Sequence, residues 1–181
     1  MTIDPNSLTF GANAAQYAAA RPRYPESLFE WIASLARVRR FAWDAGCGNG
    51  QATGALAARF EKIIASDSSA EQIALAPHIA NVEWRADAAE STALPAAEVD
   101  AAIAANALHW FDLPRFFDLL RDALSENGIF VAFGYGRSVL PAEIEQPVMD
   151  AYAALKPYWA EANRALWRGY RDLFFPLTEI E

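Results

Sequence analysis

The sequence predicts an α/β domain with a doubly wound, mainly parallel sheet. Two observations indicate this class. Short apolar segments of strand type alternate with amphipathic helical segments over residues 26–136, and a glycine-rich turn follows the first of the strands. The chain has 181 residues, of which 54% are hydrophobic and 21% charged, so it can bury one core of ordinary size.

Five segments are predicted to be strands because they are short, apolar and bounded by turn residues or by helices. They cover residues 41–45, 62–66, 81–86, 99–105 and 129–133. Because helices separate successive strands, we expect the strands to pair in parallel and the helices to cover both faces of the sheet.

Four segments before residue 128 are predicted to be helices from their apolar spacing and their end signals. They cover residues 26–38, 51–60, 70–76 and 113–127. Pro25 suits the first turn of the first helix, and Ser69 with Gln72 is a capping box for the third. Asp112 is a candidate cap for the fourth, and Gly128 is expected to end it.

The last part of the chain has a helical but irregular pattern. Proline occurs there at Pro147, Pro157 and Pro176, and we expect each to break a helix. The sheet predicted from residues 41–133 leaves the strand at 129–133 as an open edge. Because an open edge favours association, we expect either the helices of 141–176 or a second copy of the chain, in a homodimer, to cover it.

The composition argues against several partners and sites. The formal net charge is −8, which disfavours nucleic acids and anionic membranes, and the basic group of Arg37, Arg39 and Arg40 is interpreted as a solvated helix end. No apolar run is long enough to span a bilayer and no signal peptide is visible, so a cytoplasmic location is expected. With one cysteine and two separated histidines, neither a disulfide nor a metal site is predicted.

The most informative segment is Asp-Ala-Gly-Cys-Gly-Asn-Gly, which places Asp44, Gly46, Gly48 and Gly50 at every second position between a strand and a helix. Glycine lets the main chain turn sharply and approach a ligand with no Cβ in between. The turn lies where the carboxyl ends of parallel strands form a ligand crevice. This segment therefore predicts a binding site.

The spacing of the glycines separates two cofactor classes. A dinucleotide fingerprint requires Gly-x-Gly-x-x-Gly, but Gln51 or Thr53 stands where its third glycine would fall. Asp44 is also unfavourable beside a pyrophosphate, whereas a cofactor with an ammonium and a sulfonium group would favour a carboxylate there. These observations favour S-adenosylmethionine over a nicotinamide dinucleotide.

Polar residues end the next three predicted strands. Asp67 is expected to bind ribose hydroxyls, Asp87 is a candidate acceptor for an adenine amino group, and Asn106 follows the fourth strand. Each alone is typical of a turn or helix cap. Their recurrence at successive strand ends favours a crevice.

These segments resemble the class I S-adenosylmethionine-dependent methyltransferases, which share a Rossmann-like fold. The glycine turn is similar to their motif I, and Ile64-Ala-Ser-Asp-Ser and Arg85-Ala-Asp-Ala are similar to their second- and third-strand motifs. Ala14-Ala-Gln-Tyr together with Lys156-Pro-Tyr-Trp resembles the subgroup that includes trans-aconitate methyltransferases (methyltransferase type 11).

The resemblance implies roles for particular residues. It implies that the cofactor is held by a set of residues around the crevice: Asp44, Gly46, Gly48, Gly50, Asp67, Ser68, Asp87, Ala88 and Asn106. It also implies an N-terminal lid over residues 1–25, a cofactor-binding core over 26–136 and a helical insert over 137–181. Family members continue with two further strands, so this chain is either naturally shortened or part of a longer one, or more strands remain to be counted.

The remaining site residues concern the methyl acceptor, which we expect to be a small molecule such as a carboxylate or an alcohol. His109 is the candidate base or acceptor contact, with a helix-start histidine as the alternative. Tyr17, Arg21, Tyr24 and Trp110 are candidates for the lid and acceptor wall. The alternative functions are cofactor binding without catalysis and a nicotinamide-dependent oxidoreductase.

Overall fold

A computed structural model describes residues 24–135, 140–158 and 161–179 of the chain. It divides into two compact units, residues 1–133 and residues 134–181. None of the helices in the described part is both long and apolar enough to cross a membrane.

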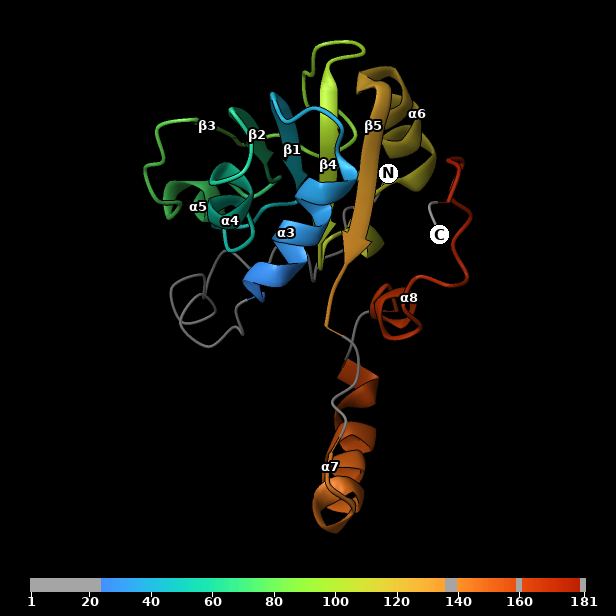
Figure 1. Cartoon of the computed structure of the whole chain (residues 1–181). Helices are drawn as coiled ribbons and strands as arrows, with labels where there is room; N and C mark the ends of the chain where they lie inside the picture. Colours follow the sequence, from blue (N-terminus) through green and yellow to red (C-terminus); the bar gives the residue numbers. More distant parts are fainter. Residues whose placement is uncertain (1–23, 136–139, 159–160, 180–181) are drawn as a thin grey trace. The chain divides into compact units, whose positions relative to one another are not determined.

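The first unit is an alternation of strands and helices (Figure 1). Its strands are β1 (Phe41–Ala45), β2 (Lys62–Ser66), β3 (Val82–Arg85), β4 (Val99–Ala105) and β5 (Leu124–Phe133). Its helices are α3 (Glu26–Leu35), α4 (Thr53–Ala57), α5 (Ala70–Ala74), the one-turn 3₁₀ helix η1 (Leu108–Trp110) and α6 (Leu113–Ala123).

The five strands form one sheet in the order β3-β2-β1-β4-β5, and every neighbouring pair is parallel. The strand order reverses direction between β1 and β4, which is the position where open α/β sheets bind ligands. This arrangement confirms the predicted doubly wound, parallel fold. β5 lies at an edge, and what covers that edge stays a prediction.

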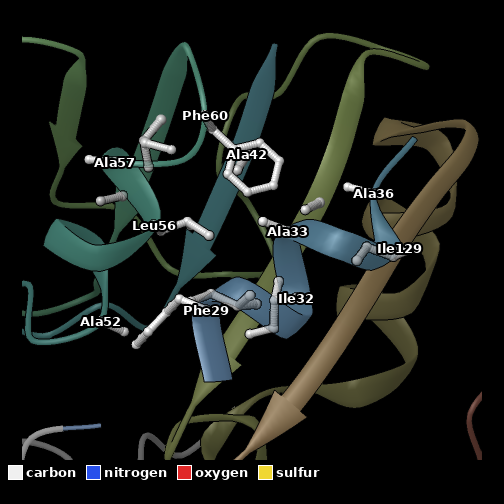
Figure 2. Packing of buried hydrophobic residues seen from close by; sticks show 14 of the residues in the cluster. Phe29, Ile32, Ala33, Ala36, Ala42, Ala52, Leu56, Ala57, Phe60 and Ile129 are labelled. Atoms are coloured by element: carbon white, nitrogen blue, oxygen red, sulfur yellow. The ribbon is translucent and has the colours of Figure 1, made fainter. Parts of the chain in front are cut away.

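A hydrophobic core lies between the sheet and helices α3 and α4 (Figure 2). Phe29 and Ile32 of α3 and Leu56 of α4 are at most 1% exposed and pack on small or branched side chains of the strands. Alanine is frequent on these strands, and its small side chain lets the helices approach closely. The abundance of alanine in the sequence therefore serves this core.

The opposite face of the sheet packs against α6 through aromatic rings. The ring of Trp43 on β1 lies 5.5 Å from that of Phe116 on α6, and Phe116 lies at the same distance from Phe130 on β5. The buried indole N–H of Trp43 donates to the Ser66 hydroxyl at 3.0 Å. Helices thus cover both faces, as predicted.

Buried Asp100, near the start of β4, forms hydrogen bonds that connect the amino ends of three strands. Its Oδ2 accepts the backbone N–H groups of Arg40 and Phe41 at 2.9 and 3.1 Å. Its Oδ1 accepts the Ser125 hydroxyl at 3.2 Å. This carboxylate joins the first residue of β1 to β4 and β5.

Several predicted boundaries are corrected by the structure. The helix predicted over 51–60 is limited to α4, because residues 48–52 form turns that continue the glycine loop. Gly128 lies within β5 and does not end α6, which already ends at Ala123. The position requires glycine because a Cβ there would approach the Val99 carbonyl oxygen to 2.5 Å. Ser69 caps α5 as predicted, whereas Asp112 precedes α6 without a side-chain capping bond.

The second unit contains α7 (Ala142–Leu155), the 3₁₀ turn η2 (Lys156–Tyr158) and α8 (Asn163–Trp167). The prediction that Pro147 breaks a helix is wrong, since α7 runs through it. Pro147 has no backbone N–H to donate to the carbonyl four residues earlier, so this turn has one hydrogen bond fewer while the helix continues to Leu155. Tyr170 is buried in this unit, and burial raises the pKa of its hydroxyl.

Candidate functional site

The glycine loop lies at the carboxyl end of β1, beside β2. The backbone N–H groups of Gly46 and Cys47 both donate to the Ser66 carbonyl oxygen, at 2.8 and 3.0 Å, so the end of β2 fixes the start of the loop. The φ angles of Gly46, Gly48 and Gly50 are +68°, +56° and +91°. L-residues rarely adopt this region, so the turn requires glycine at these positions.

The three glycines face different surroundings. A Cβ on Gly46 would lie 2.5 Å from the Cβ of Ala107, and one on Gly50 would lie 2.4 Å from the Trp84 ring. In the part of the chain that the structure describes, nothing lies within 4 Å of a Cβ added to Gly48. The fold's own side chains therefore pack against the outer two glycines, and Gly48 alone presents an open face.

Asp67, directly after β2, connects the glycine loop to the β2–α5 turn. Its Oδ2 accepts the Gly48 N–H at 2.8 Å and its Oδ1 accepts the Ser69 N–H at 2.9 Å. Burial raises the pKa of Asp67, and the two backbone N–H groups act in the opposite direction. The carboxylate thus fixes the orientation of Gly48 and keeps lone pairs for further donors.

Asp44, on β1, is fully buried and only partly satisfied. Its Oδ2 accepts the hydroxyl of Thr53, the first residue of α4, at 2.6 Å. Its Oδ1 is buried and has no hydrogen-bond partner among the described residues. Burial raises the pKa of Asp44 to about 7, with the Thr53 hydrogen bond lowering it and the charge of Asp67 raising it further.

Neither of these carboxylates has a cationic partner in the described part of the chain, where every ion pair involves other acids. Cys47 adds no positive charge, and burial together with Asp44 and Asp67 raises the pKa of its thiol. Buried carboxylates are normally paired with a cation or hydrogen-bonded throughout. An orphaned carboxylate oxygen close to an open glycine fits a ligand that carries positive charge.

The segment after β4 lies against the glycine loop. Asn106 has a φ of +56°, and its backbone N–H donates to the Phe133 carbonyl oxygen at 2.7 Å. The Phe111 ring covers Gly46, where an added Cβ would lie 3.0 Å from it. His109 and Trp110 are half-buried, with their rings 4.9 Å apart, and belong to η1.

The segment after β3 contains two further predicted site residues. Asp87 and Ala88 are half-buried and follow β3, which ends at Arg85. Glu90 accepts the Asp112 backbone N–H at 2.5 Å. This bond connects the segment after β3 to the residue that precedes α6. Ser68, after β2, is exposed.

Of the predicted lid residues, only Tyr24 lies within the described part. Its ring packs edge-on against Phe133 at the end of β5, at 4.9 Å, and against Phe29, at 6.3 Å. Tyr17 and Arg21 lie outside the described residues, as does most of the predicted 1–25 segment. A role for Tyr24 toward the acceptor stays a prediction.

Two residues that shape the site were not predicted from the sequence: Thr53 and Trp84. The available signal for Thr53 is a polar residue at the start of the helix that follows the glycine loop. Trp84 gives no signal, because its contact with Gly50 depends on how two distant chain segments meet in space.

Comparison with known proteins identifies relatives of the whole arrangement. Residues 43–132 match the family described as a methyltransferase domain. A protein of Dictyostelium discoideum that is assigned as a methyltransferase is 41% identical over 169 residues, which cover 91% of this chain and 64% of that protein. The chain thus spans slightly less than two thirds of this relative.

Solved structures share the fold. A protein from Anaeromyxobacter dehalogenans, assigned as a type II methyltransferase, has a TM-score of 0.81 and 41% identity, covering 89% of this chain and 69% of that one. The structure of a complex of DhpI with SAH has a TM-score of 0.60 and 25% identity, covering 72% of this chain and 68% of that one. From its sheet order, its glycine loop and these relatives, this chain belongs to the class I methyltransferase family.

Proposed function

We propose that this chain binds S-adenosylmethionine at the open face of Gly48 and transfers its methyl group to a small-molecule acceptor. One observation carries the proposal: a fully buried carboxylate, Asp44, keeps an oxygen without a partner beside a second acid, Asp67, and no cation among the described residues pairs with either. S-adenosylmethionine has an ammonium and a sulfonium group that would interact favourably with such a site.

Charge also favours this cofactor over the nicotinamide alternative. A pyrophosphate placed at the loop would face Asp44 and Asp67 and be repelled by both. The SAH in the DhpI complex, S-adenosylhomocysteine, is the product of methyl donation and supports an adenosyl ligand for the fold. The proposed cofactor contacts are those predicted from the sequence, with Asp67 toward the ribose hydroxyls and Asp87 and Ala88 toward the adenine.

The chemistry requires little of the protein beyond positioning. When bound, the cofactor supplies a methyl group already activated by the positive charge on its sulfur. The chain would hold acceptor and methyl donor in line, which can lower a barrier by about 7–11 kcal/mol. We assign His109 the role of accepting the acceptor's proton, because it lies on η1 directly after β4, and we assign Trp110 to the wall beside it.

Titration calorimetry with S-adenosylmethionine, S-adenosylhomocysteine and NAD, in parallel, tests the cofactor assignment. We expect the two adenosyl compounds to bind and NAD not to. Binding of NAD in preference to S-adenosylmethionine would contradict the proposal and favour the oxidoreductase. Carboxylate and hydroxyl acceptors should then be incubated with the loaded protein and analysed by mass spectrometry for gain of a methyl group.

The second candidate function is cofactor binding without turnover. Tight S-adenosylmethionine binding with no methylated product from any acceptor class would support it over the enzyme.

A further inference from the structure

We propose that Asp44, oriented by Thr53, is a positioning residue that raises the affinity of the site for the positively charged cofactor relative to its affinity for the neutral, demethylated product. This inference rests on the proposed function, because it concerns the same crevice. It adds a physical means by which the protein distinguishes the compound it must take up from the compound it must release.

The two ligands differ by one charge. S-adenosylmethionine carries a sulfonium, an ammonium and a carboxylate, and so has a net charge of +1 near neutral pH. Loss of the methyl group converts the sulfonium to a neutral thioether and leaves the product with no net charge. Because the shape of the rest of the molecule is unchanged, a fixed negative charge in the site is a direct way for the protein to separate the two.

Asp44 provides such a charge in a setting where it is weakly screened. It is 0% exposed, and the interaction between charges is stronger in a protein interior than in water. The Thr53 hydroxyl, also 0% exposed, occupies Oδ2 at 2.6 Å and leaves Oδ1 without a partner. Asp67, which interacts electrostatically with Asp44, in turn holds the Gly48 N–H. The negative charge is therefore coupled to the open face of the loop.

The protonation of Asp44 decides whether this charge is present. Its pKa of about 7 means that the carboxylate is mainly neutral at about pH 6 and mainly ionised at about pH 7.5. The other titratable groups that interact with it are Asp67 and Cys47. Its strand partners, Ala65 on β2 and Ile103 on β4, are uncharged. A bound cation should lower the pKa of Asp44 and thereby release a proton.

The test measures the ratio of the two dissociation constants, that of S-adenosylhomocysteine over that of S-adenosylmethionine, by titration calorimetry. In the wild type we expect this ratio to fall about fivefold between about pH 7.5 and about pH 6, as the ionised fraction of Asp44 decreases. At about pH 7.5, Asp44→Asn should lower the ratio about tenfold, the size expected for one nearby charge at the dielectric of a protein interior.

Two further variants sharpen the test. Glu61→Gln removes the same charge from an exposed position before β2, at the other end of the sheet, and should leave the ratio and its pH dependence unchanged. Thr53→Val keeps the carboxylate but removes the hydrogen bond that lowers its pKa, so the change in the ratio should move to higher pH. This variant and the wild-type pH series decide the question even if Asp44→Asn does not fold.

The possible failures are distinguishable. Binding of neither adenosyl compound by the wild type would overturn the proposed function and this inference with it. Binding of both, with a ratio that neither pH nor Asp44→Asn changes, would leave the proposed function standing and overturn this inference alone.

Discussion

Two buried aspartates lie near opposite ends of the same sheet and differ in how their oxygens are satisfied. Asp100, near the amino ends of the strands, is 3% exposed and accepts three hydrogen bonds that use both of its oxygens. Asp44, near the carboxyl ends, is 0% exposed, accepts one hydrogen bond and keeps one oxygen without a partner. The two aspartates are similarly buried, but only Asp100 has both carboxylate oxygens hydrogen-bonded within the described part of the chain.

This difference separates a structural carboxylate from a functional one. A buried acid whose bonds are all made within the chain stabilises the fold, and it needs no ligand. A buried acid that the fold leaves incomplete is destabilising unless something else supplies a donor or a cation. The incomplete aspartate lies next to the glycine loop at the switch point of the sheet, where a ligand is expected.

The largest expected effect is on binding at the open glycine. Gly48→Val would fill the face that no other group occupies and should abolish S-adenosylmethionine binding in calorimetry. Gly169 is a matched control, because it also has a positive φ, +64°, and open space at its Cβ. Gly169→Val should impose similar backbone strain and retain the affinity. A Gly48→Val protein that binds as tightly as the wild type would refute the loop assignment.

The next largest expected effect is on the free energy of unfolding of the protein without ligand. Burial raises the pKa of Asp44 to about 7 from an ordinary value of 3.8, so its contribution is fully present below pH 3.8 and is lost as pH rises through 7. The shift corresponds to about 4 kcal/mol, and Asp67 acts in the same direction. Denaturant titrations across this window should show the unfolding free energy falling, and Asp44→Asn should flatten the curve. An unchanged curve in that variant would contradict the burial cost.

A substitution of Asp100, the aspartate at the amino ends of the strands, should destabilise the fold. Asp100→Ala leaves the buried N–H groups of Arg40 and Phe41 without an acceptor and should lower the free energy of unfolding by about 3 kcal/mol at neutral pH. Glu126→Ala, an exposed acid next to Ser125, should change it by less than about 0.5 kcal/mol. Equal stability of the Asp100 variant and the wild type would remove the contrast between the two aspartates.

A smaller effect on binding is expected at Asp67. Asp67→Ala removes both the proposed ribose contact and the acceptor for the Gly48 N–H, and should weaken S-adenosylmethionine binding by about 1.5–3 kcal/mol. Glu71→Ala, an exposed acid on the neighbouring helix α5, is the control and should bind normally. If the dissociation constant of the Asp67 variant were that of the wild type, Asp67 would have no part in the cofactor site.

The smallest effect on cofactor affinity is expected at His109. Because its proposed role is toward the acceptor, His109→Ala should slow turnover while leaving S-adenosylmethionine affinity nearly unchanged. Single-turnover rates of acceptor methylation report the effect on turnover, and titration calorimetry reports the effect on cofactor affinity. Weakened cofactor binding with normal turnover at saturation would move His109 into the cofactor pocket.

The sequence predicted the strands well, because burial of a parallel sheet leaves a local signal. β1, β2 and β4 have the predicted bounds, each being an apolar run. The start of the fifth strand was predicted wrongly, at residue 129. β5 begins at Leu124, where the Ser125 hydroxyl donates to Asp100 on β4, a contact between residues distant in sequence. The same limit applies to the site. The acidic residues could be predicted, but the Thr53 bond that leaves one Asp44 oxygen free depends on the packing of α4 against β1.

The central claim is that the open face of Gly48, next to the incomplete carboxylate, holds a cationic adenosyl compound. A crystal structure of the protein soaked with S-adenosylmethionine tests it most directly. The predicted result is ligand density against the Gly48 main chain, with a positively charged group approaching Asp44. Density for the ligand elsewhere, or a glycine loop that stays empty at saturating concentration, would contradict it.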